Sequence, residues 1–300
     1  MTGQAGSDHA VMTSSLPSAQ ERRRRLGPVR VVAVVLAWTL YVTAFWGNFQ
    51  PPWPVWVRQY AGWAFRAIWR VYEAKVAVPA ADRMTHYLSV WLAVGFVFAA
   101  IVPVAGMRLA GRRWRDIGLG ASNGWGWRVV LLCLVVALPF AYGIAPEQKA
   151  LLTSGPWIRI AAPAIVTLPE HILITGICVA TLLPGMRFPR PAPLAPVEGA
   201  AGMRLLRWLG LAQPMPSGAS RGRRALAWLG LTPATATAVA GGGLLFGVVH
   251  VGAGPVEFMT SFPGGVAVCY VTLRCGSIWP AWVVHIGEMA LVLAFVLAGR

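Results

Sequence analysis

Residues 278–297 read IWPAWVVHIGEMALVLAFVL, an apolar run near the end of the chain. A run of about 18 or more apolar residues is long enough to cross a bilayer as an α-helix. His285 and Glu288 interrupt this run, and ionisable groups inside a membrane span are costly and usually functional. The stretch therefore predicts a membrane helix that also carries part of a functional site.

The rest of the chain repeats this apolar pattern. Of its 300 residues, 57% are hydrophobic, whereas soluble domains have about 45–50%. We predict an all-α polytopic membrane protein with about seven transmembrane helices and additional amphipathic helices in the membrane interface. The predicted spans are 31–46, 87–105, 129–144, 158–183, 234–250, 263–273 and 278–297. The sixth is short, which favours a tilted, broken or re-entrant segment.

Positive charge is concentrated outside these spans. The net charge is +16, and the basic residues cluster in an N-terminal arm, 1–28, and in two loops, 107–128 and 184–232. Basic loops stay on the cytoplasmic side of a membrane and contact anionic lipids. We therefore expect a cytoplasmic N-terminus, membrane lipids as partners and no nucleic acid.

Two segments have the composition of interfacial helices. Arginines alternate with tryptophans and tyrosine in 51–83, and loop 184–232 contains a two-copy repeat at 204–211 and 224–231. Basic and aromatic residues on one helix are typical of helices lying in the membrane surface. The predicted organisation is a disordered arm (1–28), an N-terminal membrane region (29–106) and a core (107–300) that the cytoplasmic loop 184–232 interrupts.

Three spans of the core carry candidate site residues. Glu170 follows Pro169 in the middle of a span, where proline loosens the helix and a carboxyl group could act as a general acid or base. Phe246 and His250 are four residues apart and share a helix face, as His285 and Glu288, three apart, also do. We predict one site assembled between these helices.

The stretches that carry these residues resemble the CPBP intramembrane proteases, also called the CAAX-protease or abortive-infection family. Members carry Glu-Glu-x-x-x-Arg, Phe-x-x-x-His and His-x-x-x-Asn/Asp on successive spans. The matching stretches here are PEHILITG (169–176), LLFGVVH (244–250) and GSIWPAWVVH (276–285), and RRWRDIGL (112–119) is similar to a segment that often precedes them. The resemblance covers roughly residues 107–295.

Three positions depart from the family pattern. His171 replaces the second Glu, Thr175 replaces the Arg, and Met289 stands where the family has Asn or Asp, with Glu288 one residue earlier. Glu288 could partly stand in, as a protonated donor or as a ligand of water or metal. His171 lies about 100° around the helix from Glu170, so we expect only one of the two to point into the site.

The resemblance implies that Glu170 and His250 activate a water molecule for attack on a peptide carbonyl, while His285 stabilises the oxyanion. Glu288 joins this catalytic set, and His171 and Phe246 support it. Two histidines and a glutamate would also suit a catalytic zinc ion held by Glu170, His250 and His285.

The expected protein is a bacterial endopeptidase of the cytoplasmic membrane that cleaves a hydrophobic, lipidated or sorting-signal peptide. A catalytically inactive relative that binds a partner, and a transporter with a His/Glu proton relay, are the alternatives. One geometric condition applies to the site. His250 ends its span and His285 begins its own, so they meet only if the sixth span is broken or the span boundaries shift.

Overall fold

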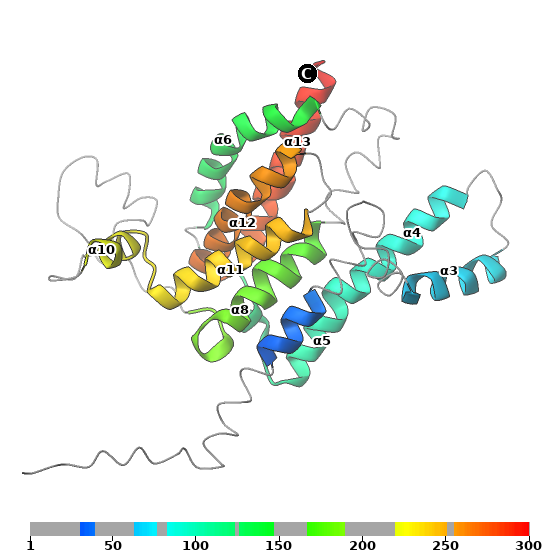
Figure 1. Ribbon diagram of the computed structural model, residues 1–300, viewed down its shortest axis with the longest axis horizontal. Helices are drawn as coiled ribbons and strands as arrows, with labels where there is room; N and C mark the ends of the chain where they lie inside the picture. Colours follow the sequence, from blue (N-terminus) through cyan, green and yellow to red (C-terminus); the bar gives the residue numbers. More distant parts are fainter. Residues whose placement is uncertain are drawn as a thin grey trace, which may run out of the picture.

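The computed structural model describes residues 31–39, 63–76, 83–123, 126–146, 167–189, 220–250 and 255–299. All regular elements in these ranges are helices (Figure 1), which confirms the all-α class. Three are long and apolar enough to cross a membrane, at Leu92–Leu109, Val256–Cys275 and Trp279–Leu297. Shorter apolar helices cover Arg128–Ile144, Thr167–Leu182 and Pro233–Val249. The count of seven spans and the domain boundaries stay predictions.

The N-terminal region is built around one long rod. Helix α4 (Arg83–Phe96) continues through the π-helical turn η3 (Val97–Ile101) into α5 (Val102–Leu109). Helix α3 (Trp63–Val76) precedes it and confirms a helix within the segment 51–83, although its place in the membrane interface stays a prediction. The helix at 31–39 packs on the rod, where Trp38 Nε1 donates to the Phe98 carbonyl over 2.9 Å.

The C-terminal half of the fold is a helical bundle (Figure 1). Its helices include α6 (Gly126–Ile144), α11 (Pro233–Val249), α12 (Pro255–Cys275) and α13 (Trp279–Leu297). Helices α11 and α12 pack very closely. A Cβ on Gly243 would lie 2.7 Å from the Val266 nitrogen, and a Cβ on Gly242 would lie 2.7 Å from Cys269 Sγ. Glycines on this face therefore allow the two backbones to approach.

The helix at 167–182 lies at the centre of the fold. Its middle is the π-helical segment η6 (His171–Cys178), followed by α8 (Val179–Leu182), and every residue of η6 is buried. Helices α5, α11 and α12 and the turn η3 all contact it. A helix covered on all sides must be apolar all round, which explains why Glu170 and His171 stand out in it.

The sixth predicted span differs from its expectation. Helix α12 runs unbroken through Pro263 and begins at Pro255, eight residues before the predicted start. Glu257 and the hydroxyls of Thr260 and Ser261 lower the hydropathy of the first two turns. Both hydroxyls bond to the Glu257 carbonyl within the helix, over 3.1 and 2.7 Å, so these turns satisfy their polar groups internally. The prediction of a short or broken span was wrong.

Short helices join the bundle at one end. Helix α10 (Arg221–Trp228) contains most of the second repeat copy, while the first copy, 204–211, lies outside the described residues. Two bonds hold the turn between α10 and α11, from Tyr270 Oη to the Leu229 carbonyl (2.7 Å) and from Arg274 Nη1 to the Gly230 carbonyl (3.1 Å). The 3-10 turns η4 (Trp114–Ile117) and η7 (Pro184–Met186) lie side by side, because Phe188 N donates to the Asp116 carbonyl. Both turns share a pocket with Thr235 of α11 and Cys275 of α12.

Candidate functional site

Three histidine rings, each from a different helix, lie around Phe246, which is buried. Its ring centroid lies 5.0 Å from that of His250, 5.7 Å from His285 and 6.2 Å from His171. Phe246 and His250 stack on one face of α11, as their spacing predicted. The structure therefore brings the predicted histidines of separate helices into one cluster.

A chain of hydrogen bonds fixes the orientation of His285. His171 Nε2 and His285 Nδ1 are 3.0 Å apart, and His171 Nδ1 lies 3.3 Å from Thr175 Oγ1. The Thr175 hydroxyl donates its proton to the His171 carbonyl over 2.9 Å, so its oxygen accepts from His171 Nδ1. In a neutral His171 ring the proton is therefore on Nδ1, and Nε2 accepts a hydrogen bond from His285 Nδ1. The Nε2 atom of His285 is then an acceptor.

His250 is oriented in a similar way. It caps the C-terminus of α11, and its Nδ1 donates to the Phe246 carbonyl over 2.8 Å. Glu170 Oε1 lies 4.0 Å from the same nitrogen. In its neutral form His250 therefore offers Nε2 as a proton acceptor, with a carboxylate placed to stabilise the imidazolium that forms.

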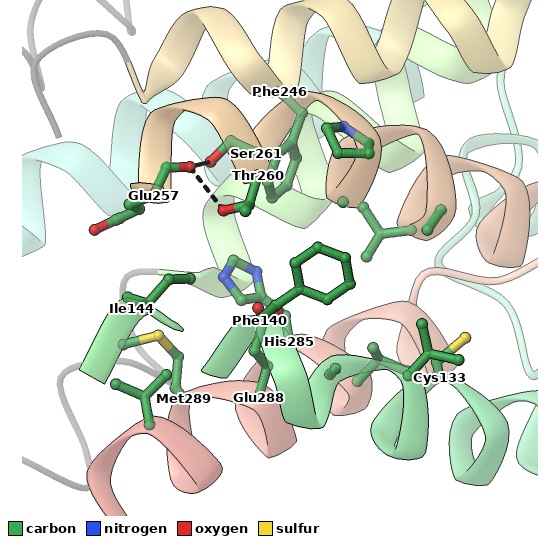
Figure 2. Close-up of a pocket in the computed structure, with 18 of the residues that line it drawn as sticks. Cys133, Phe140, Ile144, Phe246, Glu257, Thr260, Ser261, His285, Glu288 and Met289 are labelled. Carbon is green, nitrogen blue, oxygen red and sulfur yellow. Dashed lines mark hydrogen bonds between the residues drawn. The ribbon is translucent and has the colours of Figure 1, made fainter. Parts of the chain in front are cut away.

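His250 and His285 border an apolar pocket of about 340 Å³ between α6, α12 and α13. Figure 2 shows Glu257, Thr260 and Ser261 of α12 on one side, and Phe140 and Ile144 of α6 with Glu288 and Met289 of α13 on the other. Most of the remaining lining is aliphatic. His250, His285 and Glu288 line the pocket as predicted site residues, and Glu170 and His171 reach the cluster from the helix 167–182.

Glu257 is the site residue that sequence reasoning missed. It lines the pocket and lies close enough to Glu170 and Glu288 to act on both electrostatically, while His250 attracts the same two carboxylates. The available signal was a lone carboxyl group seven residues after His250. Because the predicted span began at residue 263, Glu257 was assigned to a loop.

Only one of Glu170 and His171 was expected to point into the site. The pocket lining includes neither of them, and each lies beside a different site histidine. Glu170 approaches His250 while His171 contacts His285. His250 and His285 were expected to meet only through a broken sixth span or shifted boundaries. Both lie against Phe246 although α12 is unbroken and the helices that carry them keep their predicted bounds to within one residue.

The predicted zinc ligands do not surround a common point. Among the described residues, no group of three His, Cys, Asp or Glu side chains is arranged to hold a metal ion. The Nδ1 atoms of His250 and His285 are engaged in hydrogen bonds within the protein, as the outer nitrogen of a metal-bound histidine usually is. A zinc ion held by Glu170, His250 and His285 therefore stays a prediction, and we derive no catalytic step through a metal.

Comparison with known proteins identifies one part of the chain. Residues 206–290 match the family model of type II CAAX prenyl endopeptidase Rce1-like proteins. The match includes Phe246, His250, His285 and Glu288 and begins after Glu170. Neither the curated proteins nor the solved structures yield a match. The match confirms the resemblance to the CPBP proteases over this region and, with the apolar helices, indicates a multi-pass membrane protein.

Proposed function

We propose that this chain, with its Rce1-like domain at residues 206–290, is a membrane-embedded endopeptidase that hydrolyses a peptide bond with a water molecule activated by Glu170 and His250. The observation that supports this most directly is the meeting of Glu170, His250 and His285 around Phe246, beside an apolar pocket. A family model alone would indicate only a protease; the convergence of these groups supplies a base and its charge partner.

In the proposed reaction, His250 Nε2 takes a proton from water as the water oxygen bonds to the scissile carbonyl carbon. The imidazolium so formed is stabilised by Glu170, whose carboxylate oxygen lies 4.0 Å from Nδ1. When the carbon–nitrogen bond breaks, His250 returns this proton to the leaving amine. The products are a carboxylic acid and an amine.

The hydrogen-bond network changes the role that the resemblance implies for His285. Neutral His285 donates from Nδ1 to His171, so its Nε2 accepts a hydrogen bond and cannot donate one to an oxyanion. We assign His285 to hold the attacking water by accepting from it. Oxyanion stabilisation by His285 would require a protonated ring.

The pocket favours a hydrophobic substrate that reaches the site from the lipid. Val136 and Phe140 line it and are also 54% and 40% exposed on the surface of α6. The aliphatic walls suit apolar side chains of a lipidated or sorting-signal peptide, and a bacterial cytoplasmic membrane with the N-terminus inside is the proposed setting.

Proteolysis in lipid tests this proposal. Purified protein in liposomes is incubated with a library of fluorogenic membrane peptides, beside the variants Glu170→Gln and His250→Ala. Removing a general base or its charge partner lowers rates by about 10²- to 10⁴-fold, so both variants should lose cleavage. Leu109→Ala is the matched control, because Leu109 is 90% exposed and ends α5. Cleavage at the control rate in either site variant would contradict the proposal.

A further inference from the structure

The described arginines of the core gather at one end of the bundle, which we call the arginine end. Hydrogen bonds join its segments, since Arg112 Nη1 donates to the Gly185 carbonyl (3.0 Å) and Arg274 Nη1 to the Gly230 carbonyl. In the described part of the chain, the carboxyl group at this end is that of Asp116, which accepts from Arg113 N. Its arginines are Arg108, Arg112, Arg113, Arg115, Arg128, Arg187, Arg221, Arg223, Arg224 and Arg274.

His250 and Glu257 lie toward the opposite end, whereas His285 is the seventh residue of α13, which starts at the arginine end. Helix α11 starts at the arginine end and closes with His250, while α12 starts close to Glu257 and returns to Arg274 at the arginine end. The 17 residues of α11 span about 25 Å. Both His250 and Glu257 line the pocket, so the pocket reaches the end of the bundle away from the arginines.

Helix α6 gives the same orientation independently. A Cβ on Gly126, its first residue, would lie 2.9 Å from Cys275 Sγ, at the arginine end. Ile144, its last residue, lines the pocket together with Glu257. The pocket therefore extends to the far ends of both α6 and α11.

Among the described residues, fewer cations lie at the pocket end. Tyr72 Oη of α3 bonds to His86 Nδ1 near the start of α4, and the rod that begins there ends beside Arg108. Helix α3 therefore belongs to the pocket end. In the described part of the chain, the cations of α3 are Arg66, Arg70 and Lys75, and α4 begins with Arg83. The negative charge of Glu73 in α3 offsets one of these positive charges.

We infer that the arginine end faces the cytoplasm and that the catalytic pocket opens toward the opposite, extracytoplasmic side of the membrane. Arginine-rich ends remain cytoplasmic because moving their charges across the membrane is unfavourable during insertion. Resting on the proposed protease function, this orientation specifies the substrate class. The cleaved bonds belong to peptides that have been inserted or exported and lie at the outer boundary of the bilayer, and cytosolic prenylated tails are excluded.

Labelling of single cysteines by a membrane-impermeant maleimide tests the orientation without requiring activity. The parent variant is Cys133→Ala, because Cys178, Cys269 and Cys275 are 1% exposed or less and so inaccessible to the reagent. Thr260→Cys, in the pocket, and Val256→Cys, in the first turn of α12, report on the pocket end. Gly222→Cys is the matched reporter at the arginine end, where an added Cβ meets no atom within 4 Å.

Intact spheroplasts of the expression host expose the outer face, and inverted vesicles expose the inner face. We expect Thr260→Cys and Val256→Cys to be labelled at least tenfold more in spheroplasts, and Gly222→Cys at least tenfold more in inverted vesicles. The reverse pattern, or equal labelling of both ends from one side, would overturn the inference. So would pocket cysteines labelled from neither side while Gly222→Cys reacts. Outer labelling without any cleavage in lipid would instead reject the protease function and leave the orientation standing.

Discussion

His171 offers the sharpest test of the site, because it contacts His285 and lies outside the pocket lining. We consider His171→Phe, which keeps an aromatic ring beside Phe246 but removes the partner of His285 Nδ1, now 3.0 Å away. His171 is completely buried, and leaving a buried polar group without its partner costs about 1–3 kcal/mol. If His285 loses its orientation in the transition state, that cost corresponds to a fall in kcat of about 5- to 150-fold.

The assay is peptide cleavage in liposomes, with kcat and KM measured separately beside thermal unfolding of the same preparations. KM should change little, because His171 does not line the pocket. His171→Gln is the rescue variant, since its amide can still hydrogen bond to His285 and should recover much of the lost kcat. A folded His171→Phe variant with wild-type kcat would refute the reasoning, as would equal losses of kcat in the Phe and Gln variants.

Three further predictions follow from matched contacts. Thr175→Val should lower kcat by a few-fold, whereas Thr181→Val should not. Both hydroxyls bond to the carbonyl four residues earlier, but only the Thr175 hydroxyl also contacts the His171 ring. Equal effects of the two variants in cleavage assays would contradict this. Gly243→Ala should lower the free energy of unfolding by about 1–3 kcal/mol through overpacking, because its Cβ would lie 2.7 Å from the Val266 nitrogen. Gly264→Ala has open space around its Cβ and should be neutral or slightly stabilising. Thermal unfolding in detergent compares the two variants, and a stable Gly243→Ala variant would show that the helices can separate. Chelators should leave cleavage within twofold of its untreated rate, because the described residues do not arrange three metal ligands; a loss that added Zn²⁺ restores would show that the side chains rearrange around a metal.

The candidate site was predictable to the extent that its residues break a periodic apolar pattern. Glu170, His250, His285 and Glu288 stood out because each interrupts an apolar run, and the structure places them around one ring cluster or pocket. Glu257 was missed for the opposite reason. Beside Thr260 and Ser261 it resembles the polar end of a loop, and only the internal bonds of those hydroxyls show that the helix already includes it.

The sequence by itself determined the class of this protein, because the free energy of placing side chains in a bilayer depends on their composition and order. It thereby specified apolar helices, arginine-rich connections and the few ionisable groups that a membrane helix would not carry without a function. Tertiary structure decided which of those groups meet. Glu170 lies beside His250 and His171 beside His285, although the two residues are adjacent in sequence. Helices α11 and α12 approach closely where glycines leave room. Such choices depend on distances between segments far apart in the chain, and no local pattern of residues encodes them.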